Sequence, residues 1–129
     1  RDKWSKKILA SPSEIELPVM EEQFIQKAVG FIEANIDDAN FDSEQLELAM
    51  NMSRMQFYRK LKAIMNLSGT EFIRQVRLKR AIQLMDSGHF NVSEIAWKVG
   101  FNDPSYFSRC FKKEFGVSPL KYRKEGKET

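Results

Sequence analysis

The chain has 129 residues, of which 42% are hydrophobic and 30% charged. Such a chain suits one small folded domain and excludes large multidomain enzymes as well as fibrous or disordered proteins. One cysteine and one histidine exclude a disulfide framework and a four-ligand zinc site, so we expect no metal and no cofactor. The sequence has neither an apolar run of the roughly 18 residues that span a bilayer nor a signal-peptide core. We therefore expect a cytoplasmic location.

The net charge of +3 is unevenly distributed along the chain. Residues 14–52 carry 1 basic and 10 acidic side chains, whereas residues 53–86 carry 8 basic and 2 acidic ones. The middle segment therefore offers a basic face suited to a polyanion. On composition alone, lysines and arginines that only solvate helix surfaces explain the pattern equally well.

Apolar residues at three- and four-residue spacing, with only 6 glycines and 4 prolines, predict an all-α fold of about seven helices. The first helix is expected to begin at Pro18 and to end near Asn35. Capping patterns mark the starts of the next three helices at Asp42–Gln45, Ser53–Gln56 and Ser68–Glu71. The helix that begins at Ser68 is the longest and ends at Gly88. Two further helices are expected, one after Asn91 and one that has Asp103 as its cap and Pro104 at its first helical position.

The second half of the chain repeats the first. At an offset of 50 residues the matched pairs are Ser53 with Asp103, Phe57 with Phe107, Arg59 with Arg109, and Asn66 with Gly116. Before the turn the offset is 47, because Glu47-Leu48-Ala49 matches Glu94-Ile95-Ala96. The match predicts a duplicated helix-turn-helix whose second turn is three residues longer.

We therefore predict two helix-turn-helix subdomains joined by a long central helix. The expected divisions are a linker or N-terminal extension at 1–17, the first subdomain with the linking helix at 18–88, the second subdomain at 89–124 and a tail at 125–129. Each subdomain would place its second helix in a major groove. The two grooves would follow one another on one face of the duplex, about 34 Å apart.

A motif in the second copy carries a family resemblance. The residues are Ala96-x3-Gly100-Phe101-x4-Tyr106-Phe107-x3-Phe111-Lys112-x3-Gly116-x2-Pro119-x2-Tyr122-Arg123. This motif resembles the signature of the AraC/XylS family of bacterial transcription regulators, and the resemblance covers about residues 20–124. Residues 12–17 are similar to the joint that follows a receiver domain in hybrid two-component regulators of Bacteroides-type bacteria. The resemblance implies sequence-specific binding of double-stranded DNA, with an upstream receiver or sensor domain as partner, so that the chain is either a cytoplasmic protein or the cytoplasmic part of an inner-membrane sensor protein. RNA polymerase is a further partner to consider.

Carried over residue by residue, the family's base-reading positions fall after the cap of each recognition helix. They are Arg54, Met55, Gln56, Tyr58 and Arg59 in the first, and Pro104, Ser105, Ser108 and Arg109 in the second. Arg59 and Arg109 are the strongest candidates, because a guanidinium can make two hydrogen bonds to guanine. The expected phosphate contacts are Ser53, Lys62, Lys112 and Lys113. Pro104 and Ser105 offer few hydrogen bonds, so we expect sharper base readout from the first helix.

Several alternatives stay open at this stage. The rival functions are a protein-interaction module that docks an acidic partner, such as RNA polymerase or a receiver domain, and a fragment of a base-modifying enzyme. We expect no enzymatic activity, because the sequence has no glycine-rich phosphate loop, metal cluster or nucleophile and base pair. Cys110 and His89 are more readily explained as structural than as catalytic. The acidic helix at 19–35 should face away from DNA, either as a regulatory surface or as a solvated cover.

Overall fold

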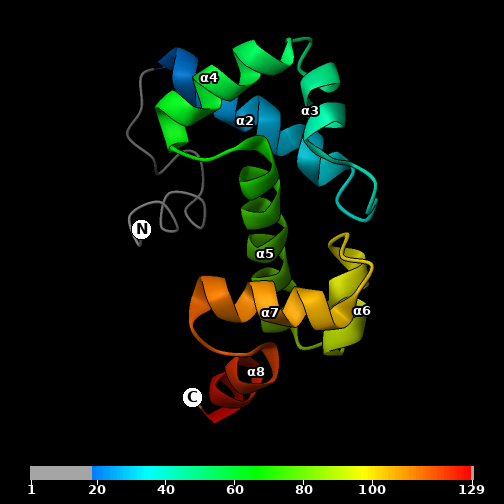
Figure 1. Cartoon of the computed structure of the whole chain (residues 1–129). Coiled ribbons are helices and arrows are strands. Elements are labelled where there is room, and N and C mark those ends of the chain that lie inside the picture. The colour runs from blue at the N-terminus through cyan, green and yellow to red at the C-terminus, as the bar shows by residue number, and fades with distance from the viewer. Residues whose placement is uncertain (1–18, 129) are drawn as a thin grey trace. The chain divides into compact units, whose positions relative to one another are not determined.

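The computed structural model describes residues 19–128, with side chains as far as Lys124. This part of the chain is entirely helical, which confirms the predicted fold class, and Figure 1 shows the course of the chain. The helices are α2 (Val19–Ala34), α3 (Ser43–Ala49), α4 (Arg54–Met65), α5 (Gly69–Ser87), α6 (Val92–Lys98), α7 (Pro104–Phe115) and α8 (Pro119–Glu128). The expected linker at 1–17, with its receiver-joint motif, lies outside the described residues. Helix α8 extends into the segment that the sequence suggested as a tail.

Helix starts follow the capping chemistry of the sequence. At α4, the Ser53 hydroxyl accepts from the Gln56 backbone N–H at 3.2 Å, and the Gln56 side chain accepts from the Ser53 N–H at 3.0 Å. The same reciprocal pair forms between Ser68 and Glu71 before α5, and between Asn91 and Glu94 before α6. Each pair satisfies two backbone donors that a helix start leaves unpaired.

Helix ends use the residue types that tolerate a left-handed backbone. Asn66 ends α4 with a φ of 58°, and Gly116 ends α7 with a φ of 82°. The repeat matched these two positions with each other, and both residue types accommodate positive φ at little cost.

The described residues pack as two compact units. The first comprises residues 19–36 and 40–76, and the second comprises 37–39 and 77–128, so the division falls inside α5. In the first unit α2 packs against α4, and the Phe24 and Phe57 ring centroids are 5.8 Å apart. In the second unit, Phe101, Phe107 and Phe111 form a chain of aromatic contacts with centroid distances of 5.2 Å and 5.8 Å. The helical spacing of these aromatic residues thus reflects core packing.

Arg77 holds residues 37–39 within the second unit. Its side chain is only 5% exposed and donates to the Val99 carbonyl at 2.7 Å and to the Asp38 carbonyl at 3.0 Å. Burial lowers the pKa of the Arg77 guanidinium, and the Asp38 and Asp37 carboxylates oppose that shift. Arg77, which belongs to the basic segment 53–86, is therefore a buried structural residue that links separate parts of the second unit.

Backbone hydrogen bonds correct the offset between the two copies. Helices α3 and α6 begin and end 49 residues apart. The bond that closes the turn joins Met52 N–H to the Glu47 carbonyl in the first copy, and Phe101 N–H to the Ala96 carbonyl in the second, at 3.1 and 2.9 Å. The predicted offset of 47 is therefore wrong. The second turn is longer by one residue, Asn102, and not by three.

Burial explains the error. The match at 47 placed Leu48 opposite Ile95, but Leu48 is 68% exposed and Ile95 is fully buried. The true counterpart of Ile95 is Leu46, which is fully buried as well. Three similar consecutive letters are therefore weaker evidence of equivalence than the side of the helix on which a residue lies.

Candidate nucleic-acid interface

The candidate base readers of helix α4 lie on the face of the helix that points away from the core. Its buried residues are Phe57, Leu61, Ile64 and Met65. Every predicted reader on this helix is exposed: Arg54, Met55, Gln56, Tyr58 and Arg59. Because α2 packs on the buried side through Phe24, the acidic helix lies on the opposite side of α4 from these residues.

Large side chains are unusually exposed on this surface. Met55 is 56% exposed and Tyr58 is 47% exposed. Gln56 is partly committed, because its side-chain oxygen accepts from Ser53 N–H at 3.0 Å. Reading adenine with both amide atoms would require Gln56 to release that cap.

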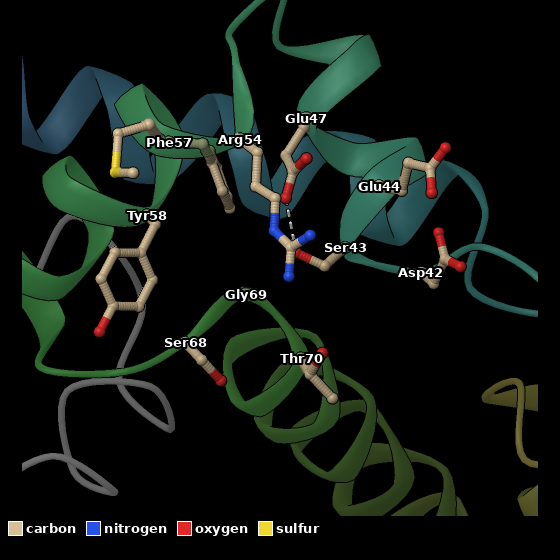
Figure 2. A pocket seen from close by; sticks show the side chains of 11 residues that line it. Asp42, Ser43, Glu44, Glu47, Arg54, Phe57, Tyr58, Ser68, Gly69 and Thr70 are labelled. Atoms are coloured by element: carbon tan, nitrogen blue, oxygen red, sulfur yellow. Dashed lines mark hydrogen bonds between the residues drawn. The ribbon is translucent and has the colours of Figure 1, made fainter.

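A groove of about 890 Å³ borders the start of α4 and is lined by residues of α3, α4 and the start of α5. Figure 2 shows Arg54 reaching from α4 into this groove on the side of Ser43 and Glu47. The Ser43 hydroxyl donates to the Glu47 carboxylate at 3.1 Å. The acidic residues that line the groove are Asp42, Glu44 and Glu47.

The sequence analysis counted these carboxylates, which form an acidic edge of the groove, in the acidic segment 14–52 but did not place them beside the first recognition helix. At the corrected offset of 49, the second copy carries Asn91, Ser93 and Ala96 where the first carries Asp42, Glu44 and Glu47. The two recognition helices therefore stand beside helices of different charge. Carboxylates repel anions, so the surface of the first copy attracts a polyanion less than its arginines alone suggest.

Gly69 keeps the helices around the groove close together. A Cβ built on this buried glycine would collide with the Ser43 side chain and lie 3.3 Å from a ring carbon of Phe57. The sequence analysis assigned no role to Gly69. Gly69 lies inside the capping box Ser68-Gly-Thr-Glu71, and nothing in this local pattern indicates that α3 approaches the glycine closely.

The Ser68 cap also perturbs a carboxylate. The Ser68 backbone N–H donates to Glu71 at 2.9 Å, and this bond is the main cause that lowers the pKa of Glu71. The hydrogen bond with the Ser68 side chain and the charges of Lys62 and Arg74 act in the same direction, against a smaller opposing effect of burial.

Helix α7 repeats the arrangement in the second unit. Phe107 and Phe111 are fully buried, whereas Ser105 and Arg109 are exposed and Pro104 and Ser108 are half-buried. The Asp103 carboxylate caps the helix by accepting from Ser105 N–H at 2.9 Å. Pro104 occupies the first helical position, as predicted.

The candidate phosphate contacts are all exposed. Ser53 is the cap of α4, and Lys62 lies in the last turn of that helix. Lys112 and Lys113 lie in the last turn of α7. Lys60, in contrast, is half-buried, and its ammonium lies 4.9 Å from the centroid of the Phe24 ring, toward α2.

A contact in the second unit joins residues far apart in sequence. The Tyr122 hydroxyl donates to the Asp86 carboxylate at 2.9 Å, which ties α8 to α5. Burial is the main cause that raises the pKa of Tyr122, and the bond to Asp86 adds to it. The sequence motif included Tyr122 but gave no indication of Asp86.

Among residues 19–128, no helix has the length and apolar character needed to cross a bilayer. Two capped helices remain as the prominent functional feature. Each exposes arginine, and each follows a short helix through a tight turn. This is the arrangement of a helix-turn-helix protein, in which the second helix enters the major groove.

Residues 47–125 match the family of helix-turn-helix domains, and the chain belongs to this family as a DNA-binding domain of AraC-type transcription regulators. It is similar to histidine kinase P4 of Formosa agariphila, with 39% identity over 113 residues, which are 88% of this chain and 8% of that protein. The chain spans less than half the length of the first curated relatives it matches.

Two solved structures are similar in fold. The C-terminal domain of AraT, a response regulator from Geobacillus stearothermophilus, has 29% identity and a TM-score of 0.71, over 78% of this chain and 84% of that one. The DNA-binding domain of AdpA, a global transcriptional factor, was crystallised in complex with a target DNA. It has 25% identity and a TM-score of 0.71, over 78% of this chain and 90% of that one.

Proposed function

We propose that this chain is the sequence-specific output domain of a longer regulator, with α4 and α7 inserted in two successive major grooves. The observation that carries this proposal is the repetition of one surface on two helices. Each helix is capped at equivalent positions, buries an aromatic at Phe57 or Phe107, and exposes an arginine at Arg59 or Arg109. One chain then supplies the two recognition helices that many regulators obtain by dimerisation.

The exposed residues after each cap are proposed to read base edges. Arg59 and Arg109 would each bind the O6 and N7 edge of a guanine, and Met55 would pack on a thymine methyl group. Ser53, Lys62, Lys112 and Lys113 would contact phosphates and fix the register of the helices. The domain performs no chemistry on the DNA in this proposal.

The regulatory signal is proposed to come from another part of a longer protein. The similarity to a histidine kinase and to a response-regulator domain supports an upstream receiver or sensor domain. The domain would act in the cytoplasm, where DNA and RNA polymerase are found, and RNA polymerase is the proposed partner for the transcriptional output.

Selection of bound fragments from genomic DNA, followed by titration with the selected duplex, tests the proposal. We expect the selected duplex to outcompete random duplex, and log K to fall against log salt with a slope near about −5 if about six phosphates are contacted. Equal affinity for all duplexes would favour the rival protein-interaction module. Covalent change of the DNA would favour the base-modifying enzyme.

A further inference from the structure

Tyr106 and Arg109 form a cation–π pair on the exposed side of α7. The guanidinium carbon of Arg109 lies over the Tyr106 ring, 5.7 Å from its centroid. The two residues are three positions apart on the helix, a spacing that brings side chains together on one face. A guanidinium within about 6 Å of an aromatic centroid is attracted by the ring.

The Tyr106 ring is itself anchored to the core of the second unit. Its centroid lies 5.9 Å from that of Phe101, which is 7% exposed and lies 5.2 Å from the fully buried Phe107. Tyr106 is 42% exposed. One part of this ring is therefore held by the core while the rest is available to Arg109.

We propose that Tyr106 is a positioning residue that holds Arg109 in the orientation needed to read a base, an inference that rests on the proposed function of Arg109. The contact with the ring uses the positive charge of the guanidinium, whereas reading guanine uses hydrogen bonds from its N–H groups. The contact with Tyr106 and base reading are therefore compatible. An arginine already held in place loses less rotamer freedom when it binds.

The first unit has a different pair at the equivalent positions. There Gln56 stands in the place of Tyr106, and Met52 stands in the place of Phe101. The Gln56 side chain is engaged with the Ser53 backbone and offers no ring. The positioning device thus belongs to the second recognition helix, the one with fewer hydrogen-bonding side chains.

The experiment compares Tyr106→Leu, Tyr106→Phe, Arg109→Ala and the double variant Tyr106→Leu/Arg109→Ala. Each is titrated with the selected duplex and with single-base-pair substitutions of it. We expect Tyr106→Leu to lower affinity about two- to fivefold and to weaken preference at the base pairs that Arg109→Ala affects. Tyr106→Phe should match the wild type, because it keeps the ring. In the Arg109→Ala background, Tyr106→Leu should add almost nothing.

A second measurement on the free protein tests the cation–π pair without DNA. In the NMR spectrum, the ring current of Tyr106 should shift the side-chain protons of Arg109 upfield, and Tyr106→Leu but not Tyr106→Phe should remove that shift. Unchanged Arg109 protons in Tyr106→Leu overturn the proposal. So does an equal loss of affinity from Tyr106→Leu with and without Arg109, which would indicate direct contact with DNA or a fold defect.

The two levels of the argument fail differently. If Arg109→Ala changes no base preference while the protein still binds duplex, the proposed role of Arg109 fails, and the positioning role fails with it. If Arg109→Ala defines base pairs that Tyr106→Leu leaves unaffected, the positioning role alone is overturned.

Discussion

Replacing Arg77 with methionine should destabilise the second unit by about 3 kcal/mol. The change removes two hydrogen bonds from a charged donor, at 2.7 Å to Val99 and at 3.0 Å to Asp38, and leaves both carbonyls without this partner. Bonds to charged groups contribute about 1.5–3 kcal/mol each. Part of that loss is recovered, because the methionine variant no longer buries the positive charge of Arg77, and burying a charge costs free energy.

Denaturant unfolding monitored by Trp97 fluorescence measures the loss of stability, because Trp97 lies in the same unit as Arg77. The sequence has two tryptophans, and a Trp4→Phe background leaves Trp97 of α6 as the only one. The expected result is a lower midpoint for Arg77→Met with an unchanged slope. Arg77→Lys keeps the charge but not the two-pronged geometry, so its loss should be intermediate.

Arg80→Met is the matched control for Arg77→Met. Arg80 lies on the same helix but is exposed, and its guanidinium donates to Gln83 at 3.0 Å on the surface. Its replacement should cost less than about 0.5 kcal/mol. Equal stability of Arg77→Met and Arg80→Met would refute the structural role of Arg77.

Three further variants test the first unit. Gly69→Ala should destabilise it by about 1–3 kcal/mol because the added methyl group meets Ser43, whereas Gly30→Ala, with open space around it, should stabilise it by up to about 1 kcal/mol in thermal or denaturant unfolding. Because the bond from Ser68 lowers the pKa of Glu71, the stability this carboxylate contributes is complete above its ordinary pKa of 4.5 and is lost as pH falls through the lowered value. Glu71→Gln should therefore flatten the acid limb of a stability against pH profile, and an unchanged limb would contradict the assignment.

Local chemistry made much of the fold predictable. Ser53 and Ser68 start helices because a hydroxyl and a side-chain carbonyl or carboxylate three residues later satisfy backbone donors within one turn. Asn66 and Gly116 end helices because positive φ costs little for asparagine and for glycine, which has no Cβ. These signals involve residues at most four apart, so a single sequence contains them.

The features that could not be predicted depend on distant residues. Arg77 meets carbonyls 22 and 39 positions away, and Tyr122 meets Asp86 at a separation of 36. No local pattern distinguishes such an arginine from one on the surface. The acidic edge beside α4 was missed for a related reason. A count of charges along the sequence does not show which of the charged residues lie next to the candidate interface in the folded protein.

The final prediction concerns Arg59 and Arg109, which the repeat places at equivalent positions on α4 and α7. Under the proposed function, Arg59→Ala should cost about 1–3 kcal/mol on the selected duplex and weaken preference at one or two base pairs. Arg109→Ala should act on different base pairs, about one helical turn away.

The two variants should also differ in how much base preference each half of the site keeps. Helix α4 exposes Met55 and Tyr58 beside Arg59, so its half of the site should keep some base preference when that arginine is removed. Besides Arg109, the predicted base readers on helix α7 are Pro104 and two serines, so its half should lose nearly all of its preference. Titration of both variants against a full set of single-base-pair substitutions measures the difference. Coincident base pairs would contradict the two-groove proposal, and a strong preference remaining in the second half-site after Arg109→Ala would show that base reading by α7 does not depend on its arginine.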